Sequence, residues 1–311
     1  MKKYLLKKNN CSGSSVSIFA QIRKKKKCYF FLLPFFTLFL LFTVIPVIIA
    51  MVLSMTQYNV LEMPKFVGFQ NYIQLFFYDD LFPTALTNTI TIAIFIGPIG
   101  YLMALLIAWM INELSPILRT ILVVLCYAPS ISGNAYLIWT LMFSGDAYGY
   151  LNSWLMNFNI ISEPIQWLTD TKYMMICVIV VSLWMSLGTG FLSFVAGLQG
   201  IDRSLYESAA IDGVSNRWQE LWFVTLPSMK PQLMFGAVMS ITAAFSAGEV
   251  CNNLCGNPST DYAVHTLVNH MQDYGNARYE MGYACGISTF LFVLMIFSNQ
   301  LIKKLLKRVG E

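Results

Sequence analysis

The sequence predicts an all-α integral membrane protein with six transmembrane helices and with both termini in the cytoplasm. Hydrophobic residues make up 57% of the 311 residues and charged residues only 12%, whereas charged residues make up about 25% of an ordinary soluble domain. The charges are also unevenly placed, because six long intervals contain none. Lysine and arginine gather in alternate connections between these intervals, and this asymmetry sets the expected orientation.

The six charge-free intervals have lengths suited to helices that cross a bilayer. They are Cys28–Leu61, Leu81–Asn112, Thr120–Gly145, Tyr173–Ile201, Pro231–Gly248 and Met281–Ile302. The shortest has 18 residues, and a bilayer core needs about 20 apolar residues in a helix. We therefore predict spans at about 29–53, 84–111, 120–143, 174–198, 232–249 and 281–302, within a membrane domain at 28–311. Ala147–Ser162 is also free of charge, but its three asparagines favour a loop.

The distribution of basic residues places the N-terminus inside the cell. With six crossings, 17 of the 20 lysines and arginines lie on the cytoplasmic side, and only Lys65, Lys172 and Arg278 lie outside. Nine of the 17 fall in residues 1–27, which carry no acid. This segment is expected to be a basic cytoplasmic tail beside an anionic lipid leaflet. A secretory signal peptide is the alternative for the first apolar run, but the run is too long and lacks a small-residue cleavage site.

The inner loop at 199–231 is expected to be structured, because it is rich in helix formers and large aromatic residues. Leu205–Ile211 is predicted to form a short helix that ends in a turn at Gly213, since glycine tolerates positive φ. Arg217–Phe223 is predicted to form a second helix that stops at Pro227.

The second of these helices carries aromatic residues on one face. Trp218, Leu221 and Trp222 stand at positions i, i+3 and i+4, which is the spacing of a single helical face. A structured cytoplasmic loop with charges and exposed aromatic side chains is typical of a surface on which another protein docks.

Short motifs in and around this loop resemble a known family. "ESAAIDG" followed by "VTLP" resembles the EAA signature of ABC-transporter permeases. Longer stretches resemble the MalF/UgpA-type sugar permeases, notably the branch associated with oligosaccharide and complex-polysaccharide import. They are "VGFQNY" (67–72), "LRTILVVLCYAPSISGNAYLIWTLMF" (118–143), "YGYLNSWL" (148–155), "GLQGIDRSLYESAAIDG" (197–213), "NPSTDYAVHTLVNHM" (257–271) and "RYEMGYACGIST" (278–289). The resemblance covers residues 30–302 and implies the type I ABC importer (MetI-like) permease fold.

The resemblance also implies that the 199–231 loop is a coupling loop that fits a cleft on an ATPase subunit. The coupling residues that it implies are Glu207, Ser208, Ala209, Asp212, Gly213, Leu226 and Pro227. Small alanine side chains permit close approach, and a carboxylate can pair with an arginine on the partner. This sequence departs from the family pattern in two ways. Ser208 replaces an alanine, and one extra residue lies between Gly213 and Val224, which we place within residues 214–218.

Three residues are candidates for the substrate pathway: Glu249, Phe245 and Trp184. The resemblance implies that the fifth span lines the pathway, where Glu249 would hydrogen-bond sugar hydroxyls; an ionisable group near membrane depth is a functional candidate. An equal alternative is that Glu249 lies in the membrane interface, faces water and has no role in the pathway. Trp184 lies deep in its span, whereas Trp109 and Trp139 near span ends fit an interfacial aromatic belt.

The segment "CNNLC" at 251–255, followed by His265 and His270, has some features of a zinc motif. Only nine residues separate Cys255 from His265, fewer than in zinc fingers of the usual kind. We therefore expect a polar outer loop with incidental cysteines and no metal site. A disulfide between Cys251 and Cys255 is an open alternative, since it would form only on an oxidising side of the membrane.

The chain has no phosphate-binding GxxxxGK pattern, so we expect ATP hydrolysis on a separate subunit. The resemblance implies a permease subunit of a binding-protein-dependent importer in the bacterial cytoplasmic membrane, carrying an oligosaccharide by alternating access. The implied partners are a second permease subunit, a cytoplasmic ATPase dimer and an extracytoplasmic solute-binding protein. No cofactor, catalytic residue or nucleic-acid partner is expected. The alternatives are a permease for another small solute and a polytopic membrane enzyme, which should concentrate Asp, Glu or His at one interface.

Overall fold

The computed structural model describes residues 26–308, and the chain divides into two compact units, Met1–Ile49 and Ala50–Glu311. The basic tail predicted at 1–27 lies almost entirely outside the described residues. The described part of the first unit is an apolar helix: α2 (Lys26–Phe39) continues through the π-helical segment η1 (Leu40–Val44) into α3 (Ile45–Leu53), whose last residues belong to the second unit. Residues Phe30–Leu53 are long and apolar enough to cross a membrane, in agreement with the span predicted at 29–53.

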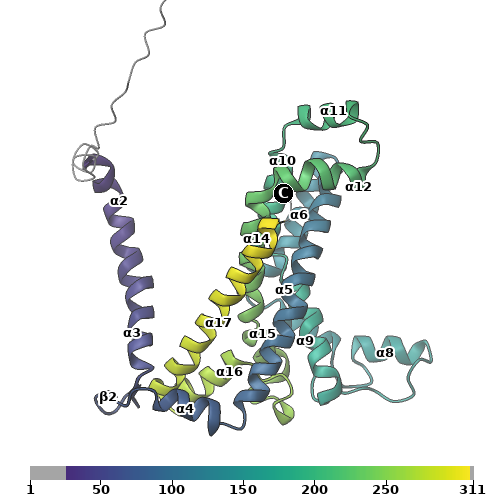
Figure 1. Cartoon of the computed structure of the whole chain (residues 1–311). Coiled ribbons are helices and arrows are strands. Elements are labelled where there is room, and N and C mark those ends of the chain that lie inside the picture. Colours follow the sequence, from purple (N-terminus) through teal and green to yellow (C-terminus); the bar gives the residue numbers. More distant parts are fainter. Residues whose placement is uncertain (1–25, 309–311) are drawn as a thin grey trace, which may run out of the picture. The chain divides into compact units, whose positions relative to one another are not determined.

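The second unit is almost entirely helical (Figure 1). Its elements in chain order are β1 (Thr56–Gln57), β2 (Lys65–Phe66), α4 (Gln70–Phe77), α5 (Phe82–Asn112), α6 (Pro116–Ile131), α7 (Tyr136–Met142), α8 (Tyr150–Asn157), α9 (Thr171–Met185), α10 (Thr189–Gln199), α11 (Arg203–Ile211), α12 (Arg217–Glu220), η2 (Leu221–Thr225), α13 (Leu226–Ser228), α14 (Lys230–Phe245), α15 (Gly248–Cys255), η3 (Thr260–Tyr262), α16 (Leu267–Gln272), η4 (Asp273–Ala277) and α17 (Met281–Arg308). β1 and β2 pair antiparallel as a minimal hairpin. Figure 1 shows α11 and α12 at one end of this unit and α4, α8 and α16 at the opposite end.

Three of the predicted spans coincide with single helices, and three coincide with bent pairs. Besides the first helix, α5 and residues Met281–Lys304 of α17 can cross a membrane by length and composition. The bent pairs are α6 with α7, α9 with α10, and α14 with α15, with bends of 87°, 40° and 41°. The part of the chain that the structure describes therefore holds three such helices, or up to six if each bent pair forms one span.

The central packing of the second unit joins α5, α10 and α14. Phe191 and Phe194 of α10 are fully buried in a cluster with Ala104 and Ala108 of α5 and Met229 before α14. A Cβ atom placed on Gly190 of α10 would lie 3.5 Å from the Cα atom of Gly236 on α14, so glycines let these two helices approach closely. Small residues at such contacts fix the relative position of helices that border the cavity described below.

The predicted stop of the second loop helix at Pro227 is wrong. The helical path runs from α12 through η2 into α13, and Pro227 lies inside α13. Proline is tolerated there because it occupies the first turn of a new helix, where its missing N–H has no intrahelical partner.

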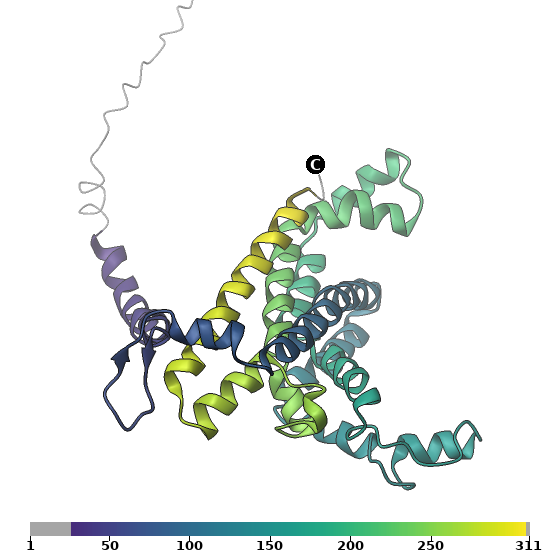
Figure 2. The same cartoon turned by 60° about the horizontal axis from the view of Figure 1, so that its bottom comes forward.

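The loop predicted at Ala147–Ser162 contains a helix, α8, which projects from the rest of the second unit (Figures 1 and 2). The hydrogen bonds of Asn152 explain why an asparagine lies in this helix. Its buried side-chain amide donates to the carbonyls of Ser144, Asp146 and Ile165 at 3.0–3.2 Å. The same side chain accepts from the Trp167 indole N–H at 2.8 Å. The amide therefore satisfies backbone groups of the surrounding loop rather than facing solvent.

Candidate functional site

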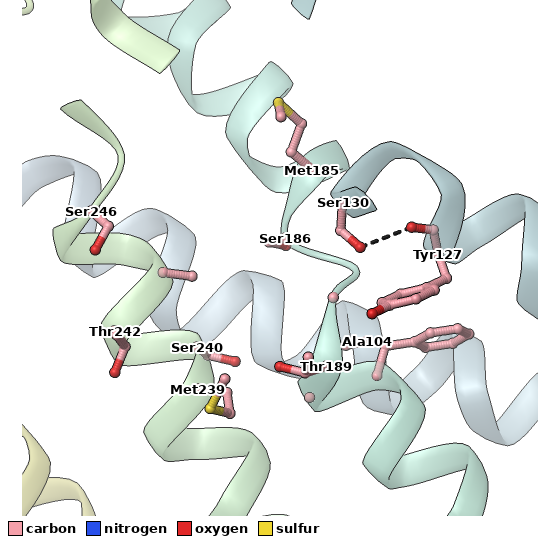
Figure 3. Close-up of a pocket in the computed structure, with 14 residues that line it drawn as sticks. Ala104, Tyr127, Ser130, Met185, Ser186, Thr189, Met239, Ser240, Thr242 and Ser246 are labelled. Atoms are coloured by element: carbon pink, nitrogen blue, oxygen red, sulfur yellow. Dashed lines mark hydrogen bonds between the residues drawn. The ribbon is translucent and has the colours of Figure 1, made fainter. Parts of the chain in front are cut away.

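A cavity whose lining combines hydroxyl groups with apolar side chains lies among the helix breaks of the second unit (Figure 3). Its volume is about 330 Å³, and α5, α6, α9, α10 and α14 contribute to its walls. Seven lining residues carry hydroxyl groups: Tyr127, Ser130, Ser186, Thr189, Ser240, Thr242 and Ser246. The remaining ones are Ala104, Met185, Gly188, Gly190, Phe191, Met239 and Ala243. None of these lining residues is charged.

The hydroxyl groups are placed by the helix ends and by local hydrogen bonds. Ser186, just after α9, donates to the Leu183 carbonyl at 2.7 Å, and Ser130 of α6 donates to the Tyr127 carbonyl at 2.8 Å. Thr242 of α14 donates in the same way to Val238 at 2.9 Å. Such bonds use the hydroxyl proton within the helix and leave oxygen lone pairs for a ligand. The cavity is therefore suited to a polar, uncharged molecule and offers no arrangement for acid–base or nucleophilic chemistry.

The three pathway residues predicted from the sequence do not line this cavity. Trp184 lies next to the lining residue Met185, but its ring packs edge-on against Trp139 at 5.6 Å between centroids. Phe245 is 6% exposed and belongs to a core cluster. Glu249 is exposed in the first turn of α15. Their assignment to the pathway stays a prediction.

The hydroxyl residues were missed because each is inconspicuous in an apolar stretch. A local signal was present in "PSISG" (129–133), "SLGTG" (186–190) and "SAG" (246–248), where serine and glycine interrupt apolar runs. These stretches coincide with the ends and breaks of the bent helix pairs.

The loop between α10 and α14 forms two helices joined by a turn, as predicted. Asp202 caps α11 by accepting from the Ser204 N–H at 3.1 Å. Gly213 follows α11 with φ of +95°, a conformation that glycine adopts without the steric cost of a Cβ atom. Asn216 then caps α12 through the Trp218 N–H.

Most of the coupling residues predicted in this loop are accessible. Glu207, Ser208, Asp212, Gly213 and Pro227 are exposed, whereas Ala209 and Leu226 are half-buried. The Tyr206 and Thr225 hydroxyls lie 3.0 Å apart and connect α11 to η2. The two parts of the predicted signature therefore belong to one connected surface element, although 12 positions separate Gly213 from Thr225 along the chain.

The second half of the loop is anchored to the end of α5. Arg217 forms ion pairs with Glu113, just after α5, at 2.9 Å and with Glu220 at 2.8 Å. The Trp218 and Trp109 rings lie 5.2 Å apart between centroids. Sequence reasoning missed Glu113 and Arg217 because nothing in the sequence links two charges about a hundred positions apart.

A π-helical turn, η2, lies in the second half of the loop. A π-helical turn closes an i→i+5 hydrogen bond and so contains one residue more than an α-helical turn. η2 spans Leu221–Thr225, C-terminal to the segment 214–218 in which the sequence pattern placed the insertion. The position of the extra residue therefore stays a prediction.

A buried polar cluster ties the loop before α16 to the start of α5. The Asp79 carboxylate accepts from His270 Nε2 at 2.8 Å and from the Tyr283 hydroxyl at 2.6 Å. His270 Nδ1 lies 3.2 Å from His265 Nε2. Both histidines are at most 2% exposed. Burial opposes ionisation of Asp79, but the hydrogen bonds from His270 and Tyr283 prevail and lower its pKa.

This cluster accounts for the two histidines that suggested a zinc motif. Cys251 and Cys255 are both free thiols. Among residues 26–308, no group of three or more His, Cys, Asp or Glu side chains is arranged to hold a metal ion. The partner of His270 is instead Asp79, a carboxylate 191 positions away.

The cluster predicts that the folded state loses stability on acidification. Burial, and then the neighbouring His270, lower the pKa of His265 to about 4. An unfolded histidine titrates near pH 6.5, so stability is fully present above that pH and falls as the pH drops toward 4, because the unfolded chain takes up the proton first. The melting temperature of the detergent-solubilised protein should therefore decrease over this range. In the variant His265→Phe the melting temperature should depend less on pH over this range. An unchanged dependence would show that His265 is not the group responsible.

The apolar helices define a multi-pass membrane protein, and a cavity with seven hydroxyl-bearing residues lies among their breaks. The family model "Binding-protein-dependent transport system inner membrane component" matches residues 96–311. The chain belongs to this family and is a permease subunit of an ABC transport system, not an enzyme.

Named relatives and solved structures extend this comparison. The lactose transport system permease protein LacF of Rhizobium radiobacter is 34% identical over 68% of this chain and 70% of its own length. The arabinooligosaccharides permease protein AraP of Bacillus subtilis (strain 168) is 29% identical over 91% and 89%. A chain of the bacterial alginate ABC transporter, crystallised with its alginate pentasaccharide-bound periplasmic protein, superposes with a TM-score of 0.73 at 25% identity, covering 93% of this chain and 98% of that chain.

Proposed function

We propose that this chain imports an uncharged oligosaccharide across the cytoplasmic membrane by alternating access. The uncharged, hydroxyl-lined cavity at the helix breaks carries this proposal. Sugar hydroxyls can donate hydrogen bonds to the oxygen lone pairs that the lining serines and threonines leave free. Phosphate or a carboxylate would call for a cationic side chain, and none lines the cavity. The names of the lactose and arabinooligosaccharide relatives support the same class of solute.

In this proposal each bent helix pair is one span, giving six spans with both termini in the cytoplasm. The loop with α11 and α12 then lies on the cytoplasmic side, where its predicted coupling residues contact an ATPase dimer. The anchor between Arg217 and Glu113 transmits movement of the loop to α5. Because α5 packs against α10 and α14, which border the cavity, the movement reaches the walls around the solute.

Three partners complete the proposed transporter. A second permease subunit forms the other side of the passage, and the ATPase dimer supplies the energy. A solute-binding protein delivers the sugar to the outer surface, a role supported by the complex known for the alginate transporter.

Thr242→Val tests the cavity directly. Thr242 lines the cavity, and its replacement removes one hydroxyl with little change in volume. We expect transport with about fivefold higher KM, since one hydrogen bond to the sugar contributes about 1 kcal/mol. The measurement is uptake of radiolabelled neutral oligosaccharides, arabinan- and maltose-derived, into proteoliposomes that contain the complete transporter.

Thr120→Val is the matched control. Thr120 is also exposed and also donates to the carbonyl four residues earlier, at 2.9 Å, but it lies outside the cavity. Its KM should equal that of the unmodified protein. Equal KM values for the two variants, or uptake of amino acids or phosphate in place of any sugar, would refute the proposed function.

A further inference from the structure

A second polar pocket, of about 480 Å³, lies at the end of the second unit opposite α11 and α12. It is formed by residues around β1, by residues of the helix α4 and by the segment that leads into α17. It shares no lining residue with the cavity among the helix breaks. Five of its ten lining residues carry side-chain amides, which is a high share for any surface depression.

Hydrogen bonds hold the walls of this pocket in place. The Asn71 amide is buried and donates to the carbonyls of Ser54 and Thr56 at 2.8 and 2.9 Å. Tyr283 is 4% exposed, and its hydroxyl donates to the buried carboxylate of Asp79. Walls fixed in this way do not have to be ordered when a ligand binds, which lowers the entropic cost of binding.

Other groups at the pocket are available to a ligand. Gln57, Gln70 and Gln74 are exposed, and none of their side chains forms a hydrogen bond within residues 26–308. An amide side chain offers two donors and one acceptor oxygen. Arg278 at the rim is held by Asp273 at 2.7 Å and lies 4.2 Å from the centroid of the Tyr274 ring.

The chemistry of these groups favours a sugar over a protein surface. Amides that both donate and accept hydrogen bonds match sugar hydroxyls. A protein-docking surface has an apolar core with a polar rim, whereas most of the residues that line this depression carry amide or charged side chains.

We propose that this pocket is an extracytoplasmic saccharide-binding subsite, which holds one end of a longer oligosaccharide before the chain enters the membrane cavity. The inference rests on the proposed function, which places this end of the molecule outside the cell. It adds a length preference to that function, because only a longer oligosaccharide can use the additional subsite.

The test is uptake by the complete transporter carrying Gln70→Ala together with Gln74→Ala. The probes are arabino-oligosaccharides of increasing length and the disaccharide of the same series. We expect KM for the long members to rise about 30-fold through the loss of two hydrogen-bonding side chains, each contributing about 1 kcal/mol, with kcat and the disaccharide KM unchanged. Gln57→Ala, on the strand side of the pocket, should shift KM in the same direction. Asn157→Ala, an exposed amide on α8, is the control.

Three results would overturn this inference. One is an unchanged KM for the long sugars in both pocket variants. Another is an equal rise in KM for the disaccharide and for the long sugars. The third is that the pocket variants bind the solute-binding protein more weakly but bind the long sugars as the unmodified transporter does. That result would make the pocket a docking site for the solute-binding protein. The effect of Thr242→Val on uptake is measured separately, so failure of the subsite leaves the proposed function standing.

Discussion

Gly213→Val is expected to reduce ATP-driven uptake about tenfold or more while the protein still inserts into the membrane. Gly213 has φ of +95°, and a left-handed conformation costs a non-glycine residue about 1–2 kcal/mol. A Cβ atom at this position would meet no atom within 4 Å, so backbone strain and not a collision changes the turn. The strain tilts α11 relative to α12. The measurements are uptake and ATP hydrolysis by the same proteoliposomes, and we expect hydrolysis to persist without uptake.

Two further variants separate coupling from general damage. Gly68→Val introduces the same kind of strain at φ of +63°, also with no atom within 4 Å, but in the loop between β2 and α4. It should destabilise the protein to a similar degree without uncoupling hydrolysis from uptake. Glu207→Arg reverses an exposed charge on α11 without strain and should uncouple. If Gly213→Val and Glu207→Arg both transport normally and co-purify with the ATPase, the proposed docking role is wrong.

Asp79→Ala is expected to lower the free energy of unfolding by about 3 kcal/mol, since removing one partner of a buried charged network leaves the others unsatisfied. The side chain of Asp79 is 5% exposed. Besides His270 and Tyr283, it accepts from the backbone N–H of Leu81 at 3.0 Å, at the start of α5. Its loss therefore releases three parts of the chain from one another. The measurement is thermal unfolding of the solubilised protein at pH 7.5.

Asp80→Ala is the matched control for this variant. Asp80 is the next residue along the chain and is exposed, so its replacement should change stability by less than about 0.5 kcal/mol. Equal melting temperatures for the two variants would show that the buried network contributes nothing to the fold.

The membrane helices could be predicted from the sequence because apolar length is a property of a whole segment. The bends within the helix pairs could not be predicted from hydropathy. α5 runs as one helix through Pro98, whereas the chain bends by 40° between Met185 and Thr189 without any proline. Only three residues separate the two helices of this pair. They hardly change the mean hydropathy of a window of about 20 residues, so a hydropathy average does not reveal the bend.

The same distinction between local and distributed features applies to the candidate sites. The two helices of the loop at 199–231 were predictable because the charges and aromatic residues of this loop stand out between apolar spans and because its motif is local. The cavity was not, since Ser130 and Thr242 come from helices far apart in the sequence and each is one hydroxyl among apolar residues. Glu249 drew attention as a charge, yet the structure places it outside the cavity.

The widened turn at Leu221–Thr225 has a consequence for chimaeric transporters. A loop taken from a relative without the extra residue, and joined to this chain at Leu226, would be one residue short. That deficit rotates the preceding helix by about 100° and turns Arg217 and Trp218 away from Glu113 and Trp109. Exchanges of ATPase specificity between relatives should therefore replace α11 alone and keep residues 217–225 of this chain, so that Arg217 and Trp218 keep their positions against Glu113 and Trp109.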